Sequence, residues 1–268
     1  MFHLILRTLT AALLAVAFLT PAAQAQTPTS AKNVPIDATT GLTTPQKTEP
    51  RPFLTPEGRG DLAMARKNFR QAVAAYQEVQ PSTAMLLNKT GIAYHQLLEL
   101  DLAKKYYEKA IKANPKYAEA INNLGTIYYA RKNYRRAQNE YKRALQVEPT
   151  SAVFYSNLGT AYFMRKEYNE AADAFQHAMQ LDPDIFEHRG SYGSTLQERN
   201  VEDRAKFHYY LAKSYAKSGA IDRALQYLRK ALEEGFKERS KLREEPEFAA
   251  MRELPAFKEL LTLEPKVL

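Results

Sequence analysis

Five histidines are the side chains in this sequence best suited to metal binding or proton transfer: His3, His95, His177, His188 and His208. They are scattered along the chain, and no two have a spacing that favours joint binding of one metal ion. The sequence contains no cysteine, which excludes disulfides, thiolate metal sites and a cysteine nucleophile. We therefore expect no metal site and no cofactor, and we expect the histidines to serve as hydrogen-bonding groups.

Catalytic patterns are also missing from the sequence. Catalysis needs a nucleophile beside a base, paired carboxylates in a pocket, or a phosphate-binding loop rich in glycine. The glycines here occur singly, as helix-packing residues would, and the histidines show no acidic partner pattern. The sequence predicts that the protein is not an enzyme.

A different chemistry is available to two asparagines, Asn123 and Asn157. Each lies two residues before a glycine, in the related stretches NNLGTIYYARKNYRRA (residues 122–137) and SNLGTAYFMRKEYNEA (residues 156–171). An amide side chain offers both a hydrogen-bond donor and an acceptor, which matches the needs of a peptide unit. The elements that position these amides therefore decide what they can bind.

Those elements repeat every 34 residues, counted from Gly91 to Gly125 to Gly159. At constant offsets after each glycine the chain places an aromatic residue, an alanine, a second aromatic residue, a second alanine and a proline. The members of these sets are Tyr94, Tyr128 and Tyr162; Ala103, Ala137 and Ala171; Tyr107, Tyr141 and Phe175; Ala110, Ala144 and Ala178; and Pro115, Pro149 and Pro183.

This pattern resembles the tetratricopeptide repeat family. Its signature positions are met in one repeat by Leu124, Gly125, Tyr128, Ala137, Tyr141, Ala144 and Pro149. The resemblance implies an all-α solenoid in which each repeat is a pair of amphipathic helices packed at small residues. We predict about five repeats, at residues 53–83, 84–117, 118–151, 152–185 and 205–238, with an insert at 186–204 and a C-terminal helical cap at 239–268.

The first residues have the features of a secretory signal peptide, with an apolar core from Leu9 to Leu19 and a small-residue motif ending at Ala25. The core is shorter than the ~20 residues that span a bilayer, so an uncleaved anchor is the less favoured alternative. We predict cleavage after Ala25, a flexible linker rich in Thr and Pro at 26–54, and a repeat array at 55–238. The mature protein is expected to be periplasmic or secreted, without a transmembrane segment.

The resemblance also implies a concave groove lined by the first helix of each repeat. In some members of the family an asparagine in this position binds the backbone of an extended peptide, so we predict that role for Asn123 and Asn157. The alternative is a hydrogen bond between helices. Six further residues are predicted to face the groove: Tyr129, Phe163 and His95 as contact area, and Lys89, Lys213 and Lys217 as a bias toward acidic groups. Tyr129 and Phe163 each follow a signature aromatic residue and are rotated from it by about 100°.

The second helices of the central repeats are basic, with twelve Lys or Arg against six Asp or Glu between Ala84 and Ser151. A solvated face and a weak contact with an acidic protein or an anionic envelope surface are both compatible with this excess. Nucleic acid is not an expected partner of an exported chain.

We predict a non-enzymatic scaffold that binds a peptide or partner protein on its concave face. The alternative is a structural component of an envelope complex, acting through the basic convex face or self-association. The insert either closes over the groove or is a passive connector.

Overall fold

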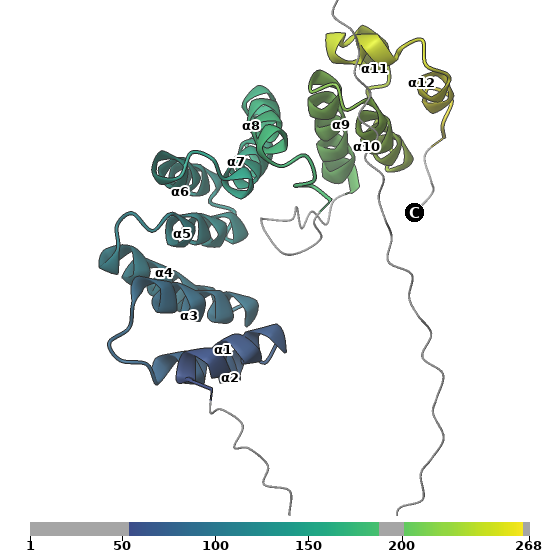
Figure 1. The fold of residues 1–268 in the computed structure, drawn as a ribbon. Coiled ribbons are helices and arrows are strands. Elements are labelled where there is room, and N and C mark those ends of the chain that lie inside the picture. Colours follow the sequence, from purple (N-terminus) through teal and green to yellow (C-terminus); the bar gives the residue numbers. More distant parts are fainter. Residues whose placement is uncertain (1–53, 188–200, 265–268) are drawn as a thin grey trace, which may run out of the picture. The chain divides into compact units, whose positions relative to one another are not determined.

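The computed structural model describes residues 54–187 and 201–264. These residues form twelve α-helices and one 3-10 helix, and no strand occurs among them (Figure 1). The predicted signal peptide, almost all of the predicted linker and most of the predicted insert lie outside the described residues. Helix α9 begins at Val201, so the last residues assigned to the insert, 201–204, are helical.

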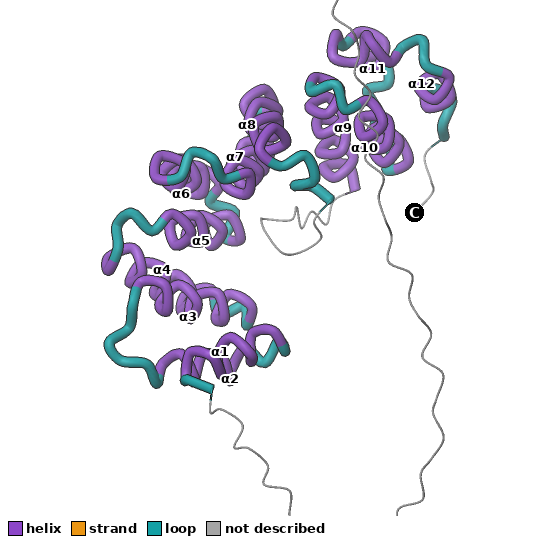
Figure 2. The backbone as a smooth tube through the Cα atoms, viewed as in Figure 1, coloured by secondary structure: helices purple, strands orange, loops and turns teal. Residues whose placement is uncertain are grey.

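The first ten helices form five pairs of consecutive helices, and the two members of each pair pack along each other. Short loops connect them (Figure 2). The pairs are α1 Pro56–Ala65 with α2 Phe69–Gln77, α3 Ala84–Gln96 with α4 Leu100–Ala113, α5 Ala118–Ala130 with α6 Tyr134–Val147, α7 Ala152–Met164 with α8 Tyr168–Leu181, and α9 Val201–Lys217 with α10 Ile221–Glu233. The all-α array of about five helix pairs is therefore confirmed.

Side-chain caps set several helix starts. The hydroxyl oxygen of Thr55 accepts from the backbone N–H of Gly58 at 3.1 Å, and Pro56 occupies the first turn of α1. The side-chain oxygen of Asn133 accepts from the N–H of Arg136 at 3.2 Å at the start of α6. Such bonds satisfy backbone donors that have no partner inside the helix, so these residues fix where the helices begin.

In each of the first four helix pairs, a glycine on the first helix contacts an aromatic ring on the second. A Cβ atom at Gly125 would lie 2.6 Å from the ring of Tyr141, and one at Gly159 would lie 2.5 Å from the ring of Phe175. Both rings are fully buried. The absence of a glycine side chain therefore creates the space that each ring fills.

The turn within each pair contains one residue in the left-handed region of the backbone. The φ angles are 59° at Lys67, 62° at Leu98, 60° at Lys132, 64° at Lys166 and 82° at Gly219. Only glycine adopts this region without steric cost, yet the central repeats have the same turn as the repeat that contains glycine. The sequence alone did not establish the shape of the turns at Lys132 and Lys166.

Replacing Leu98 by glycine is expected to stabilise the protein. Leu98 is 81% exposed, so the change removes almost no packing, and it relieves a non-glycine residue at positive φ. We expect a gain of about 0.5–1 kcal/mol in the free energy of unfolding, because the steric relief is partly offset by the extra freedom of glycine in the unfolded chain. Urea denaturation followed by circular dichroism measures this. The reverse change, Gly219→Ala, should destabilise, and a stabilised Gly219→Ala variant would contradict the argument.

The C-terminal cap comprises α11 Ser240–Glu244, the 3-10 helix η1 Pro246–Met251 and α12 Pro255–Leu260. Phe248 of η1 and Phe257 of α12 are buried in the same core cluster as α9 and α10. Helix η1 packs against α9, and α12 packs against α10. The cap thus covers apolar surface that the last repeat would otherwise expose, as terminal segments of repeat arrays must do.

Neighbouring pairs pack through the second helix of one and the first helix of the next. In addition, the first helices α3 and α5 contact each other, and so do α5 and α7. We call the surface formed by α3, α5 and α7 along these contacts the first-helix face. Most of the residues predicted to bind a peptide lie on these three helices.

Candidate functional site

Four asparagines on the first-helix face form a chain of amide contacts across three repeats. Asn157 of α7 donates to the oxygen of Asn122 of α5 at 2.9 Å, and Asn123 of α5 donates to the oxygen of Asn88 of α3 at 3.0 Å. A longer contact of 3.5 Å joins the amide nitrogen of Asn122 to the oxygen of Asn123. We call these four residues the amide ladder. The two shorter hydrogen bonds, at 2.9 and 3.0 Å, each join two successive first helices. The ladder therefore helps to hold α3, α5 and α7 in register.

The two predicted asparagines have different environments in the ladder. Asn157 is fully buried, whereas Asn123 is half-buried and reaches the surface. The prediction that both line an open groove is therefore corrected for Asn157, whose amide nitrogen is used between helices. The reason is packing: Asn157 is enclosed where α7 meets α5 and bonds to Asn122 there, while Asn123 is only half-buried. The alternative of a hydrogen bond between helices is present at both residues.

The predicted aromatic contacts also divide. Tyr129 of α5 is half-buried, with its ring centroid 5.3 Å from that of Tyr134. Phe163 of α7 is only 4% exposed and packs against Phe207 and Tyr210 of α9. The prediction that Phe163 offers groove contact area is wrong in this structure, because the fifth repeat covers the ring.

His95 and Lys89 both lie half-buried on α3. Burial lowers the pKa of His95, so its imidazole is neutral at pH 7 and can act only as a neutral hydrogen-bonding group. The ammonium group of Lys89 lies 2.8 Å from Glu57 and 2.9 Å from Asp61 of α1. Partial burial would lower the pKa of Lys89, but the hydrogen bonds to the two carboxylates outweigh it and the pKa is raised. Lys89 is therefore charged, and two acidic groups already surround it.

The two predicted lysines of α9 also have acidic neighbours. Lys213 is bonded to Glu245 at 2.7 Å and lies 3.4 Å from Glu247, both in or next to η1. Lys217 lies 3.4 Å from Asp173 of α8, and both side chains are exposed. Lys213 consequently attaches the cap to the array, and Lys217 remains accessible to an acidic group on a partner.

Acid is expected to loosen the cap through Glu245. Its partial burial raises the pKa, but hydrogen bonds from Lys213 and Tyr209 outweigh this effect and place the pKa below its ordinary value of 4.5. A carboxyl group with a depressed pKa contributes stability above its unfolded pKa and loses it as the pH falls through the folded pKa. Cap stability should therefore drop below about pH 4.5, by roughly 1 kcal/mol after allowing for solvent screening.

Hydrogen exchange of the amides of η1 and α12 measures this effect at pH 6 and pH 4. The Glu245→Gln variant should show reduced protection at pH 6 and little further loss at pH 4. The matched variant Glu264→Gln, an exposed glutamate after the cap, should behave like the unchanged protein. Equal acid sensitivity in the Glu245→Gln variant would show that another group is responsible.

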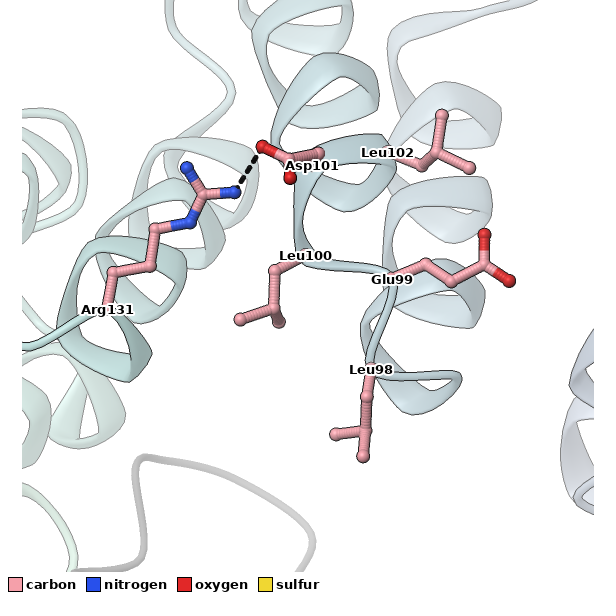
Figure 3. Close-up of a pocket in the computed structure, with 6 residues that line it drawn as sticks. All are labelled: Leu98, Glu99, Leu100, Asp101, Leu102 and Arg131. Carbon is pink, nitrogen blue, oxygen red and sulfur yellow. Dashed lines mark hydrogen bonds and ion pairs between the residues drawn. The ribbon is translucent and has the colours of Figure 1, made fainter.

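The described residues also contain a surface hollow of about 540 Å³ between the turn of the second pair and the end of α5. Figure 3 shows Arg131 directed toward Asp101 in an ion pair, while Leu98 points away from both. This hollow is formed by the turn before α4 and does not include the amide ladder. No group of His, Asp and Glu suited to hold a metal ion occurs within residues 54–187 and 201–264.

Family models match the chain over more than half of its length. Models described as tetratricopeptide repeat match residues 57–118 together with 190–236, residues 106–139 and residues 152–185, and a model described as TPR repeat matches residues 125–166. The chain belongs to the tetratricopeptide repeat family. Arrays of this family are typically modules for interaction between proteins, and they bind through extended surfaces.

Solved structures similar to this tetratricopeptide repeat chain include two of MamA. One, a crystal structure of MamA, is 22% identical and has a TM-score of 0.47. The match covers 65% of this chain and 93% of the MamA chain. Another, MamA from residue 41 to the end from Desulfovibrio magneticus RS-1, is 20% identical with a TM-score of 0.48, covering 66% of this chain and 92% of that chain. The first TPR of Spaghetti (RPAP3) bound to the HSP90 peptide SRMEEVD is 25% identical with a TM-score of 0.39, covering 41% and 86%. No curated protein matches the chain.

Sequence reasoning missed Asn88 and Asn122 as members of the ladder. A signal was present, because these two asparagines are themselves separated by the repeat length of 34 residues. An exact 34-residue repeat by itself would suggest contacts between equivalent positions. In the structure the bonded asparagines are instead 35 positions apart: Asn88 bonds to Asn123, and Asn122 bonds to Asn157. Each asparagine therefore pairs with the residue that follows its equivalent in the next repeat. The stagger between helices, which the repeat pattern does not specify, decides this pairing.

Proposed function

We propose that this tetratricopeptide repeat protein is a non-enzymatic scaffold that binds an extended peptide segment of a partner protein along the first-helix face. The observation that carries the proposal is the amide ladder, which reaches the surface at Asn123. In this proposal the first-helix face is the concave groove of the array.

Asn123 has hydrogen-bonding capacity to spare. One of its two N–H groups donates to Asn88, and its oxygen receives only the long contact from Asn122. One N–H and one lone pair thus remain among the contacts of the described residues. A peptide unit presents one acceptor and one donor, so Asn123 can bind backbone without reading a side chain. The ladder holds the amide in place, which reduces the entropy lost on binding.

The surroundings of Asn123 complete the proposed site. Tyr129 supplies half-buried aromatic area on the same helix, and the neutral His95 supplies a hydrogen-bonding group on α3. Lys89 is positioned by Glu57 and Asp61 at the N-terminal end of the face and can offer a hydrogen-bond donor there, with its charge already compensated by the two carboxylates. Lys217 extends the proposed contact at the other end. Asn157 and Lys213 support the site by holding helices and cap together.

The site can be tested with a peptide selected against the full chain from a random library, with its affinity measured by isothermal titration calorimetry. Asn123→Ala should weaken binding by about 3- to 10-fold, which corresponds to the ~0.5–1.5 kcal/mol of a neutral hydrogen bond. The matched control is Asn139→Ala, an exposed asparagine on α6 away from the ladder. It should leave the affinity unchanged.

Two outcomes would contradict the proposed site. The first is full affinity of the folded Asn123→Ala variant for every selected peptide. The second is equal weakening in the Asn139→Ala control, which would point to a general loss of structure. Circular dichroism melts of both variants separate unfolding from loss of contact.

We also propose that the protein is exported and acts in the periplasm or outside the cell. The support is the sequence of the first residues, with the apolar core from Leu9 to Leu19 and a small-residue motif ending at Ala25. Among the residues that the structure describes, no helix is long and apolar enough to cross a membrane. Mass spectrometry of the protein purified from its own cells tests the proposal, since cleavage after Ala25 predicts a mature chain that begins at Gln26.

A further inference from the structure

Most of the excess positive charge of the chain lies on two second helices. Residues 84–151 contain twelve Lys or Arg and six Asp or Glu, a net charge of +6 out of +8 for the whole sequence. Helices α4 and α6 carry most of these cations. Six exposed cations without a carboxylate partner in the described part of the chain define what we call the cationic patch: Lys105, Lys109 and Lys112 on α4, and Arg135, Arg136 and Lys142 on α6.

The cationic patch is not neutralised by carboxylates within residues 54–187 and 201–264. The neighbouring cations Lys104 and Arg143 pair with Glu108 and Glu140, but no ion pair involves the six patch residues there. The lysines of the first helices differ, because Lys89 and Lys213 each contact two carboxylates. The six patch cations thus place unpaired positive charge on α4 and α6.

Three patch residues are held in position by aromatic rings. Lys109 lies 4.9 Å from the ring centroid of Tyr106, Arg136 lies 5.7 Å from that of Tyr128, and Lys142 lies 5.2 Å from that of Tyr162. A ring attracts a cation without cancelling its charge, so the outer side of each cation stays available to an anion. Ordering the side chains in advance lowers the entropic cost of binding.

The surroundings of the patch favour an acidic polypeptide over a lipid surface. The large apolar side chains exposed on α4 and α6 are Leu102 and Val147, at 37% and 38%, so the described surface offers little to insert into a bilayer. On α8 the exposed charges Glu170 and Asp173 reverse the sign and limit the patch.

We propose that the cationic patch of α4 and α6 binds an Asp- and Glu-rich segment of a partner protein. The arginines can bind carboxylates in bidentate fashion, and the lysines add charge along α4. This surface is separate from the first-helix face, so the inference goes beyond the proposed peptide site and does not depend on it.

The proposal is tested by fluorescence anisotropy with the full chain and a labelled peptide that consists entirely of glutamate. We expect binding at low salt that weakens steeply when the ionic strength rises toward ~0.5 M, because salt screens exposed charges. The triple variant Lys105→Glu, Lys112→Glu, Arg135→Glu should bind at least about tenfold more weakly. The matched control reverses three exposed cations elsewhere, Arg66→Glu, Lys237→Glu and Arg243→Glu, and should stay within about twofold of the unchanged protein.

Three results would overturn the proposal. They are no binding of the glutamate peptide at low salt, equal weakening in both triple variants, and tighter binding to vesicles of phosphatidylcholine with phosphatidylglycerol than to the peptide. The last result would assign the patch to an anionic membrane surface. Asn123→Ala should bind the glutamate peptide normally, so failure of the patch and failure of the proposed peptide site can be told apart.

Discussion

Replacing Tyr141 by alanine should lower the free energy of unfolding by about 3–5 kcal/mol, the range for removing a large aromatic side chain from a core. Tyr141 is fully buried on α6 and lies in the core cluster with Ala137 and Leu158. The space opposite its ring is created by Gly125, which has no side chain to move into the cavity. The cavity would therefore stay largely empty. Urea denaturation followed by circular dichroism at 222 nm gives the measurement.

The control for this prediction is Arg135→Ala, at an exposed position on the same helix. Arginine and alanine both have high helix propensity. It should change the free energy of unfolding by less than about 0.5 kcal/mol. A Tyr141→Ala variant that loses less than about 1 kcal/mol would mean that the ring is not a central packing element. In that case the assigned pairing of α5 with α6 would need revision.

Gly125→Ala is expected to destabilise the protein by about 1–3 kcal/mol through overpacking. In an unobstructed helix the same change would stabilise by about 0.5–1 kcal/mol, because alanine has the higher helix propensity. The sign therefore depends on the space available. At Gly125 a Cβ atom would lie 2.6 Å from the fully buried ring of Tyr141, which cannot move without disturbing the core. The steric term is expected to exceed the propensity term.

Gly58→Ala is the matched control, since its Cβ atom would meet only Thr55 at 3.3 Å and Leu54 at 3.7 Å or beyond. We expect a near-neutral result there. A double-mutant cycle with Tyr141→Leu tests the mechanism further, because the smaller side chain should reduce the cost of Gly125→Ala. If the cost of the glycine change is unaffected by the second mutation, the clash with the ring is not its cause.

The sequence was sufficient to predict the helix pairs because their packing rules are local and repeated. Gly125 and Tyr141 are separated by a constant offset, and the same offset recurs at Gly91 with Tyr107 and at Gly159 with Phe175. A ring that fills the space above a glycine needs only two helices in contact. Three repeats with the same spacing therefore predicted the same contact three times.

The candidate site was predicted only in part, because exposure depends on what packs from outside a repeat. Tyr129 and Phe163 occupy equivalent positions, yet Phe163 is buried by Phe207 and Tyr210 of the fifth repeat while Tyr129 stays half-buried. The insert interrupts the repeat spacing before the fifth repeat, so the pattern could not indicate that α9 would cover this ring.

The amino-acid sequence by itself determined the repeat length, the small and aromatic packing positions and the basic character of the central second helices. Each of these follows from residue type at a fixed spacing. The tertiary structure decided that Asn123 bonds to Asn88 and that Asn157 is buried against Asn122. It also decided that Lys89 and Lys213 are paired with carboxylates. These contacts depend on the stagger between neighbouring helices and on the cap, and such long-range geometry is not encoded in the spacing of one repeat.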